Sequence, residues 1–134
     1  MQGTILCVID FSGSARKTLQ WAIDNACQTK CHLTVLYPYR LQKLENGENP
    51  FEMRKKIEDD ARSKFDKLEN ELLAGTKISY EFKAEVGFLA NRVEAHSKNH
   101  GVSFLVINRD LKTTHRESFD DLVDHTQIPV VIIP

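Results

Sequence analysis

The chain has 134 residues, the size of one domain, and its 41% hydrophobic and 28% charged residues are typical of a soluble globular protein. Eighteen Lys and Arg residues against nineteen Asp and Glu residues give a formal net charge of -1, which argues against a dedicated nucleic-acid-binding protein. No apolar run approaches the roughly 20 residues that span a bilayer, and the N-terminus lacks the pattern of a secretory signal. We therefore expect a single cytoplasmic domain over residues 1–134, with neither nucleic acid nor membrane as a partner.

Three cysteines, Cys7, Cys27 and Cys31, are an odd and sparse set, so free thiols are expected rather than a disulfide framework. Cys27, Cys31 and His32 could ligate zinc, but a second ligand pair at a zinc-site spacing is lacking. We expect no metal here, and buried or half-buried thiols.

His96 and His100 have the i, i+4 spacing of paired metal ligands on a helix. Ser97 stands where the zinc-protease motif has Glu, and no third ligand can be placed. Surface histidines are therefore expected, and no metal site.

The first elements read as strand, helix and strand. Residues 4–10 form an apolar, β-branched run that ends in Asp10, as expected of a parallel strand buried on both faces. A turn follows, in which Ser12 or Ser14 is available as an N-cap. The next helix has an apolar stripe formed by Ala15, Leu19, Ala22, Ile23 and Ala26. A buried strand over residues 33–37 is expected to end at Pro38.

A polar, turn-rich connection over residues 40–50 precedes a long helix, expected over residues 51–74. One face of that helix is apolar and comprises Met53, Ile57, Ala61, Phe65, Leu68 and Leu72. Gly75 ends the helix at the position that favours glycine. Residues 78–86 alternate between apolar and mostly polar side chains, which predicts a strand at the edge of the sheet.

A helix over residues 88–99 and a buried strand over residues 103–108 come next. The inward face of the helix comprises Leu89, Val93 and His96. The polar residues 109–116 are expected to form a loop.

Ser118 and Asp121 resemble a capping box, which predicts a short helix from Ser118 to about residue 126. The last strand is expected to run from Pro129 to Ile133.

This alternation of strands and helices predicts an α/β fold, a three-layer α/β/α sandwich around a five-stranded parallel sheet. Right-handed crossovers and one reversal of winding give the Rossmann-like strand order 3-2-1-4-5. The switch point lies between the first and fourth strands, so a ligand is expected at their carboxyl ends, near Asp10, Ser12 and Asn108.

Asp10 and Ser12 also have a purely structural interpretation, in which they organise the turn after the first strand. Arg109, Lys112 and Arg116 could bind an anion through their side chains, although neighbouring acids dilute that charge. No serine has the Gly-x-Ser-x-Gly context of a hydrolase nucleophile, so no catalytic centre is indicated.

The sequence resembles the universal stress protein family along nearly its whole length. The opening strand, the turn from Asp10 to Ser14 and the following Leu19-Gln-Trp-Ala22 look like that family's first strand, turn and helix. The ending Ile128-Pro129-Val130 is similar to the start of its final strand. The resemblance implies the adenine nucleotide alpha hydrolase-like variety of this fold, and a stress-response or regulatory role.

ATP-binding members of that family carry Gly-x2-Gly-x9-Gly-(Ser/Thr) after the fourth strand, where bare backbone N–H groups approach the phosphates. Residues 108–118 of this chain contain no glycine, and Glu117 would repel a triphosphate. We therefore expect no cofactor and no enzymatic activity. The alternative is a protein that binds ATP or AMP through Asp10, Ser12 and Asn108, with an atypical phosphate loop and weak hydrolysis.

The last strand is apolar and lies at the sheet edge in the expected order, where an uncovered strand is prone to pairing. Two copies that meet about a two-fold axis would cover it, and the resemblance implies the same interface, because family members commonly dimerise through this strand. We expect a homodimer through Pro129 to Ile133, with room for a further, unidentified protein partner. A receiver domain is disfavoured, because it needs several acids near its first strand and a lysine after its last.

Overall fold

The computed structural model describes residues 3–42, 45–99 and 101–134. The elements follow one another as β1 (Thr4–Val8), α1 (Ala15–Thr29), β2 (His32–Tyr39), α2 (Pro50–Leu68), η1 (Glu69–Leu73), β3 (Tyr80–Val86), α3 (Leu89–Asn99), β4 (Val102–Asn108), α4 (Leu111–Thr114), α5 (Arg116–His125) and β5 (Val130–Ile133). All strand pairs are parallel and the order is β3-β2-β1-β4-β5, which confirms the predicted topology.

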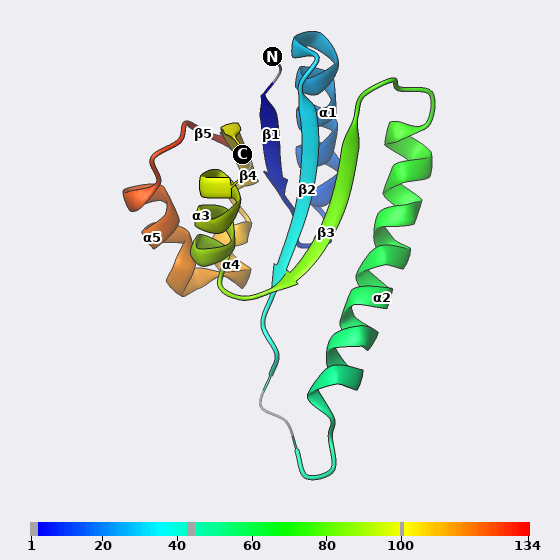
Figure 1. The fold of residues 1–134 in the computed structure, drawn as a ribbon, viewed down its shortest axis with the longest axis vertical. Helices are drawn as coiled ribbons and strands as arrows, with labels where there is room; N and C mark the ends of the chain where they lie inside the picture. Colours follow the sequence, from blue (N-terminus) through cyan, green and yellow to red (C-terminus); the bar gives the residue numbers. More distant parts are fainter. Residues whose placement is uncertain (1–2, 43–44, 100) are drawn as a thin grey trace.

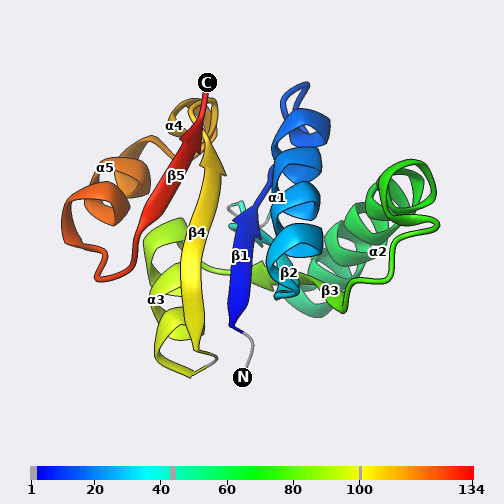
Figure 2. The same ribbon diagram turned by 90° about the horizontal axis from the view of Figure 1, so that it is seen from above.

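Helices cover both faces of this sheet, as expected of successive right-handed crossovers (Figures 1 and 2). α1 and α2 lie on one face, and α3 and α5 lie on the other. Two separate groups of buried apolar side chains fill the two interfaces between helices and sheet. The chain is therefore the three-layer α/β/α sandwich that the alternating pattern predicts.

The position of β1 at the centre of the sheet explains why its sequence is continuously apolar. Ile5 and Cys7 face the side of α1, whereas Leu6 and Val8 face the side of α3, and all four are fully buried. The strand ends at Val8 rather than at residue 10, although the Ile9 N–H still donates a hydrogen bond of 3.0 Å to the Leu36 carbonyl.

Pro38 does not end β2, which continues to Tyr39 and corrects the expected boundary at residue 37. The pairing of β2 with β1 ends at Leu36, so Pro38 lies beyond the last residue of β2 that has a partner in β1. On the other side, the Tyr39 carbonyl accepts a hydrogen bond of 2.8 Å from the Gly87 N–H. The missing N–H of proline therefore removes no bond from the sheet, which is the setting that strand prolines require.

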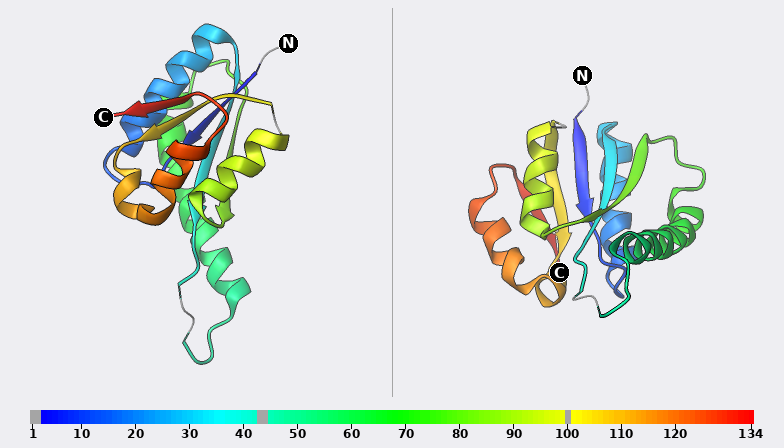
Figure 3. Two further views of the ribbon diagram at one scale, coloured as in Figure 1. Left: turned by 90° about the vertical axis from the view of Figure 1, so that its left-hand side faces the viewer. Right: turned by 60° about the horizontal axis from the view of Figure 1, so that its bottom comes forward.

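The long helix begins at Pro50, where Asn49 caps it by accepting a hydrogen bond from the Phe51 N–H. Its first turns run past the carboxyl ends of β2 and β3 (Figure 3). Its last turn, η1, is π-helical: the Ala74 N–H reaches the Glu69 carbonyl, five residues back. Gly75, at φ 86°, ends it as predicted.

That π turn changes which leucine is buried. The extra residue per turn rotates the end of the helix. Leu73 is consequently 3% exposed and packs in the core, while Leu72 is only half-buried. Leu72 still packs against the core as predicted, but the more deeply buried Leu73 was not expected on the apolar face.

Residues 109–116 were expected to be a loop, but Leu111–Thr114 form the short helix α4. Leu111 is 1% exposed and packs with Leu6 and Leu105 in the core on the α3 side of the sheet. One buried leucine thus anchors an otherwise polar segment at the carboxyl end of β4.

Candidate functional site at the carboxyl ends of β1 and β4

Asp10 organises the turn between β1 and α1. One of its carboxylate oxygens, Oδ1, accepts the Ser12 N–H at 3.0 Å, which is the local bond of an Asx turn. The other, Oδ2, accepts the hydroxyl of Thr114 at 2.9 Å. Phe11, between Asp10 and Ser12, has a φ of 60°, in the left-handed region. Both oxygens of the predicted binding acid are therefore engaged within the chain.

Ser12 and Ser14 contribute differently from the expectation. Their hydroxyls lie 2.9 Å apart and share a hydrogen bond, and Ser14 precedes α1 without a side-chain bond to the helix backbone. The Ser12 carbonyl instead accepts the Ala15 N–H at 3.1 Å. The predicted side-chain cap is absent: Ser14 has φ -89° and ψ -7°, a helical backbone rather than the extended one that a capping side chain requires.

Asn108 is the last residue of β4 and is 4% exposed. Its Nδ2 donates to Oγ1 of Thr18 on α1 at 3.0 Å, and its Oδ1 accepts the Asp110 N–H at 2.8 Å. The Thr18 hydroxyl in turn donates to the Ser14 carbonyl at 2.9 Å. The amide therefore links the end of β4 to the first turn of α1.

The structure brings Asp10 and Ser12 together in one turn, and it places Asn108 on the neighbouring strand end. No hydrogen bond joins Asn108 to Asp10 or Ser12 within the described chain. Thr114 is the partner that sequence reasoning missed. An isolated leucine in this polar stretch, Leu111, was the sequence signal for α4, the helix that carries Thr114.

A pocket of about 220 Å³ lies beside this network, and its lining comprises Arg40, Phe88, Thr113, Thr114, His115, Arg116, Glu117 and Ser118. The guanidinium of Arg40 stacks 3.9 Å from the centre of the Phe88 ring. Burial lowers the pKa of His115 below its ordinary 6.5, and the charge of Asp10 opposes that change in part. The pocket therefore has two guanidinium groups and one acid on its walls.

Only one of the three cations expected to bind an anion lines this pocket, namely Arg116. Nζ of Lys112 instead lies 3.8 Å from Oδ1 of Asp120. Arg109 is exposed and does not line the pocket. Arg40, which follows β2, is a second lining cation that the sequence did not indicate.

Ser118 does not begin the last helix. α5 starts at Arg116, and the Ser118 hydroxyl accepts the N–H of Ala90 at 2.8 Å. Ser118 is 7% exposed, so this bond satisfies a donor in the first turn of a different helix, α3. The capping-box prediction was wrong about which helix the serine caps.

The structure confirms some of the predicted environments of the histidines and cysteines and corrects others. His96 is 5% exposed, which confirms its predicted place on the inward face of the helix and makes the expectation of a surface histidine wrong. Its Nε2 lies 2.9 Å from Oε1 of Glu85. His100 lies outside the described residues. Cys7 is buried and Cys31 half-buried, whereas Cys27 is exposed, against expectation. Within the described part of the chain, no three His, Cys, Asp or Glu side chains are grouped as metal ligands.

Among the described residues, no helix has the length and apolar character needed to cross a membrane.

β5 is an edge strand that pairs on one side with β4. Ile133 is 6% exposed, whereas Ile132 is 42% exposed. The outer edge of the sheet thus ends in an apolar strand with one open side.

Comparisons with known proteins agree with this architecture. No curated protein matches the sequence. A universal stress protein from Burkholderia pseudomallei has a similar structure, with a TM-score of 0.78 and 19% identity over 98% of this chain and 96% of that one. One from Archaeoglobus fulgidus in complex with dAMP has a TM-score of 0.67 at 15% identity, covering 100% of this chain and 98% of that one. A universal stress protein in complex with cAMP has a TM-score of 0.69 at 17% identity, over 98% and 97% of the two chains.

At these identities the solved structures establish the fold, and the sequence adds its own evidence. The model of the universal stress protein family matches residues 1–134, the whole chain. The chain belongs to the universal stress protein family.

Proposed function

We propose that this chain is a stress-response or regulatory protein that acts as a cytoplasmic homodimer on a protein partner and does not hold ATP as the family's ATP-binding members do. The observation that carries the last part of the proposal, the lack of ATP binding of the ordinary family kind, is the hydrogen bond from Thr114 to Asp10. By its resemblance to the family, Asp10 matches the acid that in ATP-binding members contacts the adenine end of the nucleotide. Here an adenine would have to share a carboxylate that already accepts two hydrogen bonds from the chain.

The loop after β4 supports the same proposal. Residues 108–118 contain no glycine, so side chains stand wherever backbone N–H groups would have to approach phosphates closely. Glu117 lies in the first turn of α5, where its charge is favourable to the helix and unfavourable to a phosphate. Neither feature suits a triphosphate.

Isothermal titration with ATP and Mg²⁺, repeated with AMP, tests this proposal. We expect no heat of binding and no shift in thermal unfolding, although a ligand at 100 times its Kd would stabilise the fold by about 2.7 kcal/mol. Binding at micromolar affinity that is lost in Asp10→Ala would overturn the proposal.

Adenine-nucleotide binding is the second candidate function, and the pocket that Arg40 and Arg116 line favours it. Guanidinium groups bind phosphate through side chains, without glycine backbone. Two structural neighbours were solved with dAMP and with cAMP, nucleotides that carry one phosphate. AMP binding that is weakened by Arg116→Gln and by Asp10→Ala, with ATP excluded, would establish this candidate in place of the first.

A further inference from the structure

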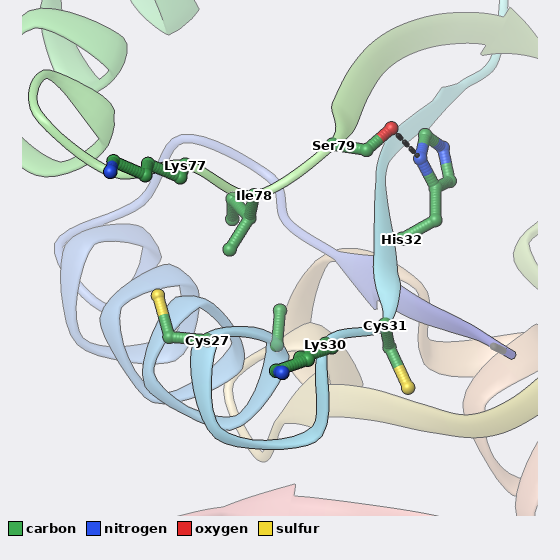
Figure 4. Close-up of a pocket in the computed structure, with 8 residues that line it drawn as sticks. Cys27, Lys30, Cys31, His32, Lys77, Ile78 and Ser79 are labelled. Atoms are coloured by element: carbon green, nitrogen blue, oxygen red, sulfur yellow. Dashed lines mark hydrogen bonds between the residues drawn. The ribbon is translucent and has the colours of Figure 1, made fainter.

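A second pocket, of about 590 Å³, lies at the opposite end of the sheet from Asp10 and Asn108. It forms where the end of α1 faces the segment that leads into β3 (Figure 4). His32, in its lining, is the first residue of β2 and pairs in register with Thr4, the first residue of β1. The pocket therefore lies at the amino ends of the strands, away from the edge where sheets of this kind usually bind ligands.

The inner surface of this pocket is apolar. Ala26 is fully buried on α1, and Ile78 is half-buried and packs against the same core. In Figure 4 the Ile78 side chain points from its segment toward the end of α1. A ligand in this space would thus cover hydrocarbon as well as polar groups.

The two facing walls each carry a lysine. Lys30 lies at the end of α1, and Lys77 lies beside Ile78 on the opposite segment. Neither ammonium group has an ion pair or a hydrogen bond with another residue that the structure describes, and no described residue in the lining is an acid. The charges of Lys30 and Lys77 are therefore not neutralised by ion pairs with described residues, which favours an anion.

The backbone of Lys30 gives a second reason to look for a use of its side chain. Lys30 has φ 58° and ψ 34°, the left-handed conformation that ends many helices. Glycine adopts that conformation without the steric cost of a Cβ atom. Helix termination alone therefore does not account for a lysine at this position.

His32 and Ser79 fix the remaining polar wall. Nδ1 of His32 lies 2.7 Å from Oγ of Ser79, and its Nε2 lies 3.6 Å from Oε1 of Glu81. The Ser79 hydroxyl and Nδ1 of His32 therefore share a hydrogen bond, with Glu81 on the other side of the ring. The wall is thus held in place before any ligand arrives, which reduces the entropy lost on binding.

We propose that this pocket binds a small amphipathic organic anion. Its apolar body lies over Ala26 and Ile78, and its charged group is held between Lys30 and Lys77. This binding is separate from the proposed function and from the nucleotide question at the other end of the sheet.

The test uses a charged and an uncharged form of one probe, 8-anilinonaphthalene-1-sulfonate and N-phenyl-1-naphthylamine, in fluorescence titrations of the full chain. We expect the sulfonate to bind at least tenfold more tightly than the uncharged amine, and its affinity to fall with added NaCl. Lys30→Gly with Lys77→Gln should weaken sulfonate binding about tenfold, since each exposed charge contributes a few-fold. Lys56→Gln, at an exposed lysine of α2, should leave it unchanged.

Two further measurements separate binding from folding and locate the probe. Lys30→Gly relieves the left-handed backbone, so its midpoint of thermal unfolding should rise while its affinity falls. Bound sulfonate should slow the alkylation by iodoacetamide of Cys27, which is exposed and lines the pocket. The proposal is overturned if the sulfonate does not bind, if the uncharged probe binds equally well, if the double variant binds like the wild type, or if Cys27 is not protected.

Discussion

The hydroxyl of Thr114 donates a hydrogen bond of 2.9 Å to Oδ2 of Asp10, across 104 positions of sequence. Because Oδ1 of Asp10 accepts the Ser12 N–H, the carboxylate joins the turn after β1 to the short helix α4 that follows β4. The buried side chain of Leu111 fixes the other end of the same short helix. The carboxyl ends of β1 and β4, where this fold binds ligands, are thus cross-linked by the chain itself.

Replacement of Thr114 by valine removes this cross-link while keeping the shape of the side chain. We expect Thr114→Val to lower the free energy of unfolding by about 1 kcal/mol, the usual net contribution of such a bond. Urea denaturation monitored by circular dichroism measures it. Thr113→Val is the matched control, because the Thr113 hydroxyl has no hydrogen bond within the described chain. Equal stability of the two variants would contradict the role given to Thr114.

The strand order and the location of Asp10, Ser12 and Asn108 were predictable, because both follow from local patterns. A strand buried on both faces must be continuously apolar. Strands that alternate with helices, joined by right-handed crossovers, can form only a few sheet topologies. The same reasoning places residues that follow the first and fourth strands at one edge of the sheet.

The partners of these residues were not predictable, because they come from distant segments. Ser118 has a sequence context that suits a cap for its own helix, yet its hydroxyl accepts the N–H of Ala90, 28 positions earlier. Thr114 reaches Asp10 in the same way. The predicted end of β2 at Pro38 was wrong for a similar reason. Proline interrupts a strand only where its missing N–H would bond to a neighbouring strand, and this depends on where that neighbour ends.

The π turn of η1 predicts that alanine substitutions at two adjacent leucines, Leu72 and Leu73, lower the free energy of unfolding by different amounts. Leu73→Ala removes a side chain that is 3% exposed, so we expect a loss of about 2–4 kcal/mol of stability. Leu72→Ala, at a half-buried position, should cost less than half as much. Urea midpoints of the two variants decide between this register and a regular α-helix, in which the larger loss would fall on Leu72.

His115 predicts a dependence of stability on pH. Burial lowers the pKa of the folded imidazole below 6.5, so the unfolded chain takes up a proton at pH values where the folded chain does not. The folded state should therefore lose stability as the pH falls from about 6.5 toward that lowered pKa. His115→Gln should flatten this part of the curve of urea midpoint against pH. Parallel curves for wild type and His115→Gln would exclude His115 as the cause.

The open side of β5 predicts the assembly state. If two copies pair along this strand, a charge on its exposed face should separate them, because lysines on edge strands prevent pairing. Ile132→Lys is the chosen change, since Ile132 is 42% exposed and its replacement should leave the monomer folded. Light scattering coupled to size exclusion, at micromolar protein, should give twice the chain mass for the wild type and one chain mass for Ile132→Lys. Val123→Lys, at a similarly exposed apolar residue of α5, should remain dimeric. A monomeric wild type would refute the dimer, and a dimeric Ile132→Lys would place its interface on another surface.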